Sequence, residues 1–443
     1  MKAAFCTLGC KVNQYETQAM LELFREAGYE TADFDEVADV YVINTCTVTQ
    51  TGDKKSRQMI SRAHALNPDA KIVVVGCYSQ VAPEEVKKIP GVWMVLGTRE
   101  RSRIVSLFEA SLNAEEEVFV VEPLTRDDDF EEISAIHESR TRAHLKIQDG
   151  CDRFCTYCII PYARGNIRSR SLKSVHEEME KLAAEGYSEI VLTGIHVMSY
   201  GRDFCDGTTL ANAFALAEDI SEIRRVRLGS LEPNMADAAF VEAVKKSSKV
   251  CRHFHLSMQS GSASVLKRMN RRYTPEEYEA AVNRLRAAMP GCAITTDVIV
   301  GFPGETEEEF METEAFLRRV ALSRIHVFPF STRKGTKAAQ MEGQLSKSAK
   351  AERAKKMIAL GNELEGAYLR SFFNTTQEVL FEECEKDYAY GHTGTYARVG
   401  VKGGEELLGR LCNVNVERLE NGCLYGTLSQ ETQEEMYGKL SIL

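Results

Sequence analysis

Three closely spaced cysteines are the residues of this sequence best suited to chemistry. Cys151, Cys155 and Cys158 are separated by three residues and then by two. A loop with this spacing can direct three thiolates at one centre, and thiolates prefer soft metals such as zinc or the iron of an iron–sulfur cluster. A structural zinc site takes four ligands, and a closed [4Fe–4S] cluster takes four cysteines. Three cysteines therefore also allow a cluster with one open iron, while zinc and a plain electron-transfer cluster remain alternatives.

A second set of cysteines follows buried strands in residues 1–125. Four apolar runs alternate there with helical patterns, which predicts a Rossmann-like parallel sheet covered by helices. The predicted strands are Lys2–Leu8, Val40–Thr45, Lys71–Gly76 and Trp93–Gly97. Cys10, Cys46 and Cys77 each follow one of these runs, where ligand sites gather in such folds. Three unrelated buried thiols are the alternative, but the shared position favours a second three-cysteine cluster with an open iron.

Six strand–helix units in residues 138–370 predict a partial (β/α)6 barrel of TIM type. The strands are His144–Gln148, Glu189–Thr193, Arg225–Leu228, His253–Met258, Ala293–Val300 and Arg324–Phe330. The active site should lie at their carboxyl ends, which is where the loop of Cys151 falls. The acidic segment 126–137 separates this barrel from the first domain and is interpreted as a solvated linker.

The last domain, residues 371–443, shows short alternating runs punctuated by glycines. The predicted strands are Gln377–Phe381, Tyr396–Val401, Leu407–Val416 and Leu424–Leu428. This pattern indicates a small β-barrel of OB type. From residue 372 onward the domain holds 6 Lys plus Arg against 12 Asp plus Glu, so we do not expect its whole surface to bind phosphates.

Composition limits the function classes. Of 443 residues, 44% are hydrophobic and 27% charged, which is typical of soluble globular proteins. No apolar run reaches the ~20 residues of a membrane span, and the first residues do not resemble a signal peptide. We therefore expect a cytoplasmic protein, in which 13 cysteines favour metal binding or catalysis over disulfides. The net charge of −10 limits any RNA site to a local basic surface.

The motifs resemble those of a known enzyme family. C-x3-C-x2-C, with Tyr157 before its last cysteine, resembles the signature of radical S-adenosylmethionine (SAM) enzymes. This resemblance implies that the open iron binds SAM, which is split to a 5′-deoxyadenosyl radical. G-C-x-x-N at Cys10, N-T-C at Cys46 and G-C at Cys77, followed by such a core, resemble the methylthiotransferases. That family implies two [4Fe–4S] clusters, the second carrying the sulfur, and no catalytic residues beyond the cluster ligands. The last domain is similar to the RNA-binding TRAM domain.

The same resemblance implies a set of SAM contacts at the carboxyl ends of the barrel strands. We interpret His196 as part of the pocket wall and not as a catalytic residue. The predicted contacts are Tyr157, Thr193, Gly194, His196, Ser230, Glu232, Gln259, Ser260, Ile299 and Gly301.

Basic residues near the barrel mouth predict an RNA surface. The candidates are Arg164, Arg168, Arg170, Arg271, Arg272 and Arg333. Tyr162, Tyr273 and Phe330 could stack on unpaired bases.

Within the family, the segments around Cys151, Cys158 and Thr193 most resemble the branch that acts on N6-threonylcarbamoyladenosine in tRNA. The resemblance implies methylthiolation of C2 of this nucleoside at position 37 of tRNAs that read codons beginning with A. It also implies binding of the anticodon stem-loop and a low-potential electron donor of flavodoxin or ferredoxin type. Methylthiolation of N6-isopentenyladenosine is one alternative. A non-enzymatic RNA-binding protein with zinc or an iron–sulfur cluster is the other, although it would leave the predicted SAM pocket without a role.

Overall fold

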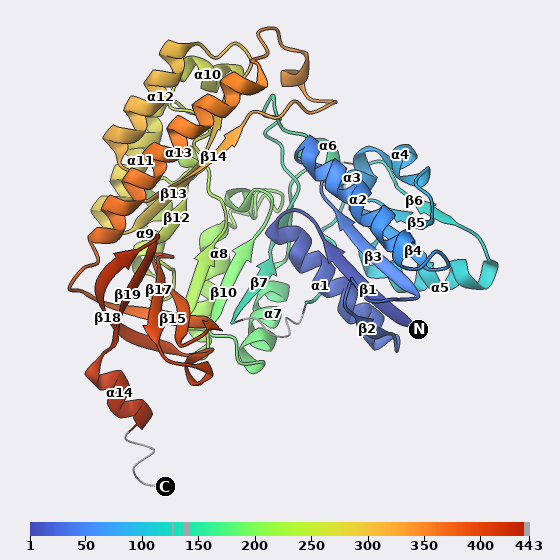
Figure 1. Cartoon of the computed structure of the whole chain (residues 1–443), viewed down its shortest axis with the longest axis horizontal. Coiled ribbons are helices and arrows are strands. Elements are labelled where there is room, and N and C mark those ends of the chain that lie inside the picture. Colours follow the sequence, from blue (N-terminus) through green and yellow to red (C-terminus); the bar gives the residue numbers. More distant parts are fainter. Residues whose placement is uncertain (126–127, 136–140, 438–443) are drawn as a thin grey trace.

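The first part of the chain is a six-stranded parallel sheet with helices on both faces (Figure 1). The computed structural model describes residues 1–125, 128–135 and 141–437. The strand order is β2-β1-β3-β4-β5-β6. The elements are β1 (Lys2–Thr7), α1 (Lys11–Glu26), β2 (Glu30–Ala32), β3 (Val40–Thr45), α2 (Gln50–Leu66), β4 (Lys71–Gly76), α3 (Cys77–Val81), α4 (Pro83–Lys87), β5 (Val92–Leu96), α5 (Ile104–Ala114) and β6 (Val118–Val120).

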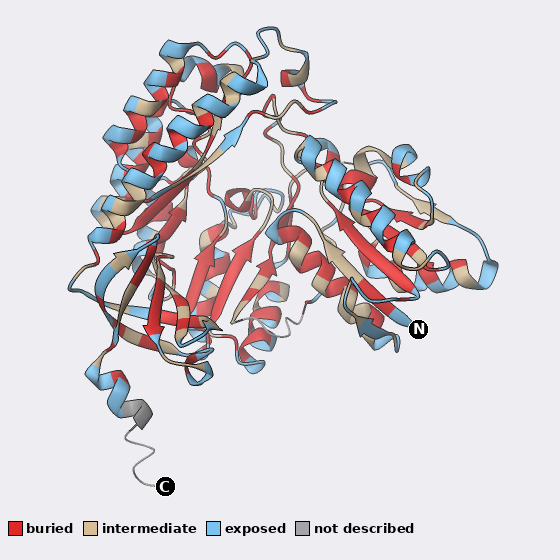
Figure 2. Cartoon of the chain, in the orientation of Figure 1, coloured by how far each residue is buried: buried red, intermediate tan, exposed pale blue. Residues whose placement is uncertain are grey.

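Helices α1 and α5 cover one face of this sheet, and α2, α3 and α4 cover the other. Strands β3 and β4 are therefore buried on both faces (Figure 2). This double burial explains why they are nearly continuous apolar runs instead of alternating patterns. All four predicted strands are present, whereas the short edge strands β2 and β6 are too brief to show a periodicity.

The second part is an open parallel barrel with helices outside. Its strands form the sheets β11-β10-β7 and β12-β13-β14, which are joined by bridges from Val226 to Val250 and from Leu231 to Leu256. The elements are β7 (Arg142–Lys146), β8 (Gln148–Asp149), α6 (Ile160–Arg164), β9 (Arg168–Ser169), α7 (Leu172–Ala184), β10 (Glu189–Thr193), α8 (Leu210–Ala215), β11 (Arg225–Leu228), α9 (Ala238–Lys246), β12 (His253–His255), α10 (Ala263–Arg268), α11 (Pro275–Ala288), β13 (Ala293–Val300), α12 (Glu307–Val320), β14 (Arg324–Pro329) and α13 (Lys347–Arg370).

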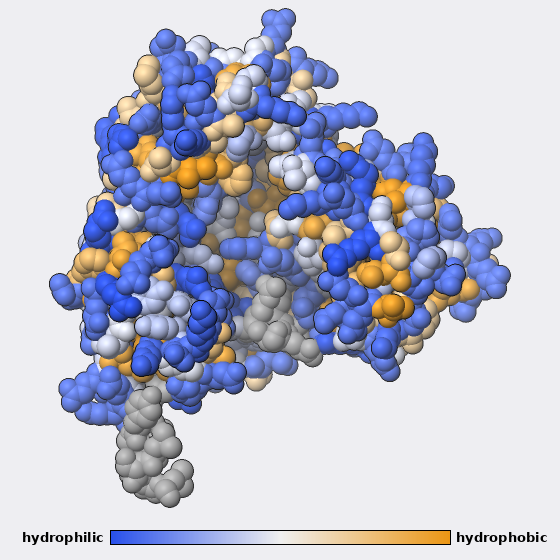
Figure 3. Space-filling model, in the orientation of Figure 1, coloured by the Kyte–Doolittle hydropathy of each residue, from blue (hydrophilic) through white to orange (hydrophobic). Residues whose placement is uncertain are grey.

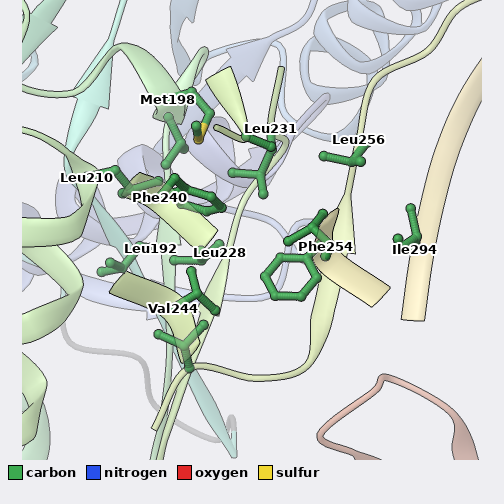
Figure 4. Close-up of a cluster of buried hydrophobic side chains, with 14 of the residues drawn as sticks. Leu192, Met198, Leu210, Leu228, Leu231, Phe240, Val244, Phe254, Leu256 and Ile294 are labelled. Atoms are coloured by element: carbon green, nitrogen blue, oxygen red, sulfur yellow. The ribbon is translucent and has the colours of Figure 1, made fainter. Parts of the chain in front are cut away.

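The core of this barrel lies between its strands and its outer helices. Figure 4 shows Leu192 and Leu228 from the strands beside Leu210 of α8 and Val244 of α9. Since the apolar side chains pack outward against helices, the inner face of the strands is free to carry polar groups. The predicted (β/α)6 architecture is thereby confirmed.

The last part is a closed five-stranded barrel, in the order β15-β16-β17-β19-β18, as predicted for a TRAM-like domain. It comprises β15 (Thr376–Glu385), β16 (Tyr388–Thr393), β17 (Arg398–Lys402), β18 (Leu411–Glu420), β19 (Cys423–Leu428) and a helix, α14 (Gln430–Tyr437). The sequence pattern does not predict β16, because the glycine within this strand, Gly391, is typical of a turn. A Cβ at Gly391 would lie 2.1 Å from the Leu380 carbonyl oxygen, so glycine lets these two strands approach.

The interpretation of 126–137 as a solvated linker is wrong for its described part, residues 128–135. The Asp128 side chain is buried and pairs with Arg99 at 2.9 Å and with Arg168 at 3.5 Å. Ile133 and Ala135 are buried against α1. Asp128 thus pairs with arginines from both neighbouring domains, whereas Asp129 and Glu132 are exposed. The rest of the predicted linker, 126–127 and 136–137, lies outside the described residues.

No helix in the described ranges has the length and apolar character needed to span a bilayer.

Candidate active site

The loop of Cys151, Cys155 and Cys158 follows β8 at the carboxyl end of the barrel strands. Gly150 (φ +73°) precedes it, and a Cβ there would lie 1.7 Å from the Asn166 carbonyl oxygen, so only glycine fits. The Thr156 amide and hydroxyl donate hydrogen bonds to the carbonyl oxygens of Met269 (3.0 Å) and Arg268 (2.9 Å). The loop is therefore anchored at both its start and its centre.

The three thiols of this loop interact with one another and with a guanidinium group. Arg271 Nη1 donates a hydrogen bond to Cys155 Sγ at 3.4 Å. Burial, reinforced by the neighbouring thiols, raises the pKa of Cys151 to about 11 and that of Cys158 to about 12. These thiols hold their protons at neutral pH until a cation displaces them, which is how thiolate ligands bind metals.

Cys10, Cys46 and Cys77 come together at the carboxyl edge of the first sheet. Cys10 precedes α1, Cys46 follows β3 and Cys77 begins α3 directly after β4. A Cβ at Gly9, the residue before Cys10, would lie 3.1 Å from Cys46 Sγ. Besides burial, Cys10 itself contributes to the raised pKa of both Cys46 and Cys77. The three predicted ligands of the second set thus lie near one another at this edge of the sheet.

Neither cysteine set has the geometry of a single-ion site. Among the residues that the structure describes, no three His, Cys, Asp or Glu side chains converge closely enough to bind one metal ion. In a cubane cluster each cysteine binds a different iron, so its thiolates need not meet at a point. Each set consists of three free cysteines with an arginine donor at one sulfur. This donor set fits a three-cysteine iron–sulfur cluster better than a mononuclear zinc site.

A buried ionic network joins the two cysteine sets. Arg164, close behind the first loop, donates from Nε to Cys77 Sγ at 3.3 Å and from Nη1 to Glu16 of α1 at 2.5 Å. Lys146 Nζ lies 2.7 Å from both Glu16 and Asp149. Arg101 adds a third cation, 2.9 Å from Glu16. One set of charges therefore fixes the position of the sheet relative to the barrel.

This network determines the charge of its carboxylates. Burial alone would raise the pKa of Glu16, but Arg101, Arg164 and Lys146 outweigh it and lower the pKa to about 2. Asp149 behaves in the same way, because the nearby cations hold its pKa well below the ordinary value. Both carboxylates are therefore ionised at neutral pH and compensate the buried cations.

The prediction that Arg164, Arg168 and Arg170 bind RNA is wrong. All three are buried and bind groups of this chain instead: Glu16, Asp128 and Glu178 are among their partners. Two further predicted RNA contacts are also enclosed. Arg271 lies beside Cys155, and Arg333 forms an ion pair with Asp53 of α2 and a hydrogen bond to Thr47. Only Arg272 of the predicted group is exposed.

The three aromatic residues that were predicted to stack on bases also differ in their exposure to solvent. Tyr273 and Phe330 are buried, whereas Tyr162 is 51% exposed. Phe154, inside the cysteine loop, is 44% exposed and packs edge-on against Tyr162 at 5.9 Å between ring centroids. The sequence analysis missed Phe154, although an aromatic residue between two ligands of an exposed loop is a signal that could have identified it.

Two of the predicted SAM contacts, His196 and Glu232, bind each other beside the loop of Cys151, Cys155 and Cys158. His196 Nε2 lies 2.9 Å from Glu232, and the His196 amide donates to Gln148 Oε1 at 2.7 Å. Glu232 also pairs with Arg153 at 2.7 Å. Burial would raise the pKa of Glu232, but the hydrogen bond from His196 and the adjacent arginines lower it. The carboxylate is thus ionised and already engaged within the chain.

Other predicted SAM contacts have different surroundings. Thr193, Gly194 and Ser230 line a cavity that is described below. Tyr157 and Ile299 pack on an apolar cluster beneath the loop. Gln259 is half-buried and has a left-handed backbone (φ +69°).

Two predicted contacts bind or pack against helices instead. Ser260 is buried, and its hydroxyl lies 3.2 Å from that of Thr313 on α12. A Cβ at Gly301 would lie 2.5 Å from Lys350 Cγ, so glycine at this position lets α13 pack close to the backbone. Neither residue lines the cavity that contains Thr193.

A cavity of about 450 Å³ lies between the second cysteine set and the interior of the barrel. The view in Figure 3 shows the surface hollowed between the amino-terminal domain and the barrel. Cys10 and Lys11 line the cavity from one side, and Gly194 and Ser230 from the barrel side. Its volume is within the range of small-molecule sites, about 300–1,000 Å³. The cavity is therefore large enough for a modified nucleobase.

The carboxyl-terminal barrel closes the base of this cavity with Tyr396. This residue has a left-handed backbone (φ +70°) and lines the cavity wall. Its ring stacks on His392 at 4.7 Å and lies 4.6 Å from the Arg227 guanidinium. Glu378 binds Arg225 at 2.8 Å beside it. The acidic excess of the last domain thus partly serves to dock it onto barrel arginines.

Comparisons with known protein families define the class of enzyme. The Radical SAM superfamily matches residues 145–317, and the family described as "Uncharacterized protein family UPF0004" matches residues 2–97. These ranges contain the two cysteine sets. The class implies a [4Fe–4S] cluster and SAM, and the three-cysteine donor set fits that cluster.

Curated relatives give a narrower assignment. The chain is 45% identical to the threonylcarbamoyladenosine tRNA methylthiotransferase of Bacillus subtilis, over 93% of each protein. The protein of that name from Aquifex aeolicus is 42% identical over 80% of this chain and 86% of its own length. The tRNA-2-methylthio-N(6)-dimethylallyladenosine synthase of Natranaerobius thermophilus is 35% identical over 96% of each. The chain belongs to the radical SAM tRNA methylthiotransferase family.

Solved structures have a similar fold over most of this chain. The radical SAM methyltransferase TsrM from Kitasatospora setae superposes with a TM-score of 0.55 at 16% identity, covering 74% of this chain and 72% of that protein. The cobalamin-dependent radical enzyme OxsB gives 0.51 at 13% identity, covering 82% and 61%. At these identities the similarity concerns the fold alone.

Proposed function

We propose that this protein methylthiolates C2 of N6-threonylcarbamoyladenosine at position 37 of tRNAs that read codons beginning with A. The observation that carries the proposal is the 45% identity to a relative of that name over 93% of both chains. Relatives named for the dimethylallyl substrate are 34–35% identical. The cavity between Cys10 and the interior of the barrel supports the proposal, because it is large enough for the modified base and lies beside the second cysteine set.

We assign Cys151, Cys155 and Cys158 to one [4Fe–4S] cluster and Cys10, Cys46 and Cys77 to a second, each with one open iron. Cys151, Cys155 and Cys158 would hold the cluster that, with SAM, would supply the radical chemistry needed at C2, and Cys10, Cys46 and Cys77 would hold the cluster that would supply the methylthio group. The chain itself must orient the base, exclude water and hold the two sets in place. Arg164 and Arg271 support this assignment, since each directs a guanidinium donor at a cysteine sulfur.

The tRNA partner would approach the open side of the cavity with its anticodon stem-loop. Arg272 and Lys334 are exposed cations that remain candidates for phosphate contacts. Phe154 and Tyr162 present exposed rings on which unpaired bases could stack. We place the reaction in the cytoplasm, with a low-potential donor of flavodoxin or ferredoxin type reducing the first cluster.

A direct assay separates the candidate substrates. The protein, reconstituted anaerobically with iron and sulfide, is given SAM, a reductant and one of two anticodon stem-loops, which carry either N6-threonylcarbamoyladenosine or N6-isopentenyladenosine. Mass spectrometry of the digested RNA should show a methylthio group only on the first. Modification of the stem-loop with N6-isopentenyladenosine alone would assign the protein to the branch that acts on that nucleoside. Binding without modification or SAM cleavage would favour the non-enzymatic alternative.

A further inference from the structure

The cavity beside Cys10 contains a cation that no residue in the described part of the chain pairs. Lys11 lines the cavity directly after Cys10 and also lines an adjoining cavity of about 400 Å³. Its ammonium group makes no hydrogen bond or ion pair with any residue in the described part of the chain. Lys11 is also the first residue of α1, whose N-terminus has no side-chain cap. The positive end of this helix therefore faces the same space.

The two arginines of the cavity are already compensated. Arg227 Nε binds Glu189 at 2.9 Å. Asp297 lies 3.4 Å from His255, which neutralises the carboxylate only when the imidazole is protonated. Arg324 pairs with Glu365 at 3.6 Å outside the cavity. Lys11 thus differs from Arg227 and Arg324 in having no carboxylate partner among the described residues. A cation held in a protein cavity is stabilised when the bound ligand brings an anion.

The substrate of the proposed function carries such an anion. Threonylcarbamoyl groups end in a carboxylate and a hydroxyl, whereas isopentenyl groups contain only carbon and hydrogen. The ureido N–H of N6-threonylcarbamoyladenosine can donate an internal hydrogen bond to ring N1. This bond places the threonyl group at the ring edge that carries C2, the atom that must face Cys10. The residue next to Cys10 is therefore well placed for the carboxylate.

We propose that Lys11 binds the threonyl carboxylate of the substrate and thereby selects N6-threonylcarbamoyladenosine over nucleosides with apolar N6 groups. This inference rests on the proposed function and adds its specificity determinant. A different role for Lys11 is to offset the negative charge of the Cys10, Cys46 and Cys77 set. The two roles differ in one respect: only the first depends on the charge of the substrate.

Binding without turnover tests this dependence. Fluorescence anisotropy on the reconstituted protein, without reductant, would measure the dissociation constants of three labelled stem-loops. They carry N6-threonylcarbamoyladenosine, its threonyl methyl ester or N6-isopentenyladenosine. The variants are Lys11→Met, Lys11→Arg and, as a matched control, Lys55→Met on the exposed side of α2. Iron content and thermal unfolding of each variant would show whether the clusters and fold are retained.

The wild type should bind the acid about ten- to a hundredfold more tightly than the ester, as expected for a hydrogen bond between charged groups. Lys11→Met should lose the preference for the acid and bind the ester as tightly as the wild type does. Lys11→Arg should keep part of the preference for the acid. Lys55→Met should keep all of this preference. Equal weakening of acid and ester by Lys11→Met would overturn the inference, as would a wild type that does not distinguish them. Turnover of the isopentenyl stem-loop alone would instead refute the proposed function.

Discussion

Arg164 and Arg271 place guanidinium donors beside cysteine sulfurs, at 3.3 Å from Cys77 and 3.4 Å from Cys155. The sequence analysis assigned both to RNA, because an arginine near a predicted active site does not reveal its partner. The partner cysteines are 87 and 116 residues away in the chain. Only the fold brings them together, so composition and spacing could not distinguish a thiolate from a phosphate partner.

Replacing one cysteine of each set should have different consequences. Cys155→Ala should abolish SAM cleavage, because it removes a ligand of the first cluster. Cys46→Ala should leave SAM cleavage intact and abolish methylthiolation, because it affects only the second set. Chromatography of 5′-deoxyadenosine and mass spectrometry of the RNA measure these two activities. Methylthiolation retained in Cys46→Ala would refute the two-cluster assignment.

The exposed aromatic pair should contribute to RNA affinity. Phe154→Ala and Tyr162→Ala should each weaken binding of the stem-loop by about 1–3 kcal/mol if a base stacks on the ring. Met311→Ala on α12, an equally exposed apolar residue, is the control and should bind as the wild type does. Filter binding at constant salt measures the difference. Unchanged affinity in both aromatic variants would remove this pair from the RNA surface.

At the scale of elements, α1 connects the site to the rest of the molecule. It begins after Cys10, and it carries Lys11 toward the cavity and Glu16 into the buried network. The sequence predicted a helix at this place from its apolar periodicity. It could not predict the role of Glu16, whose partners Arg101, Lys146 and Arg164 belong to later parts of the chain.

Glu16→Gln should therefore destabilise the protein by about 3 kcal/mol at neutral pH, because three buried cations lose a carboxylate. The pKa of Glu16 is lowered from 4.5 to about 2 in the folded protein. The contribution of this carboxylate is thus complete above pH 4.5 and declines as the pH falls toward 2.

The difference in unfolding free energy between wild type and Glu16→Gln should shrink over that pH range. Urea unfolding at several pH values measures it, and Glu26→Gln, exposed at the end of the same helix, is the control. A difference that stays constant down to pH 2 would contradict the assigned ionisation of Glu16.

Buried strands and the six cysteines were the most predictable features. Apolar runs such as β3 and β4 are easily recognised, and a thiol at a strand end is conspicuous in the sequence. Short or exposed elements such as β2 and β16 give weaker patterns. The described part of the linker was misjudged because an acidic residue such as Asp128 is solvated in most chains, whereas here arginines of two domains bury it.

At the scale of the molecule, three domains surround one cavity. The amino-terminal sheet contributes Cys10 and Lys11, the barrel contributes its polar inner face, and the last domain contributes Tyr396. The carboxyl-terminal barrel is therefore a wall of the site as well as a candidate RNA-binding appendage.

Tyr396→Ala should loosen the docking of the last domain, since it removes a ring packed on His392 and Arg227. A loss of about 1–2 kcal/mol is expected from the cation–π and stacking contacts. Tyr396→Phe keeps the ring and should behave as the wild type. Differential scanning calorimetry should show a lower first transition only in Tyr396→Ala. Identical transitions in all three proteins would show that this ring does not stabilise the domain interface.

The central claim is that each three-cysteine set holds an iron–sulfur cluster, and iron analysis combined with SAM cleavage tests it most directly. After anaerobic reconstitution, the wild type should contain about eight irons per chain and release 5′-deoxyadenosine from SAM when reduced. A variant with alanine at Cys10, Cys46 and Cys77 should contain about four irons and still release it. A wild type with only about four irons, or with zinc and no 5′-deoxyadenosine, would contradict the account.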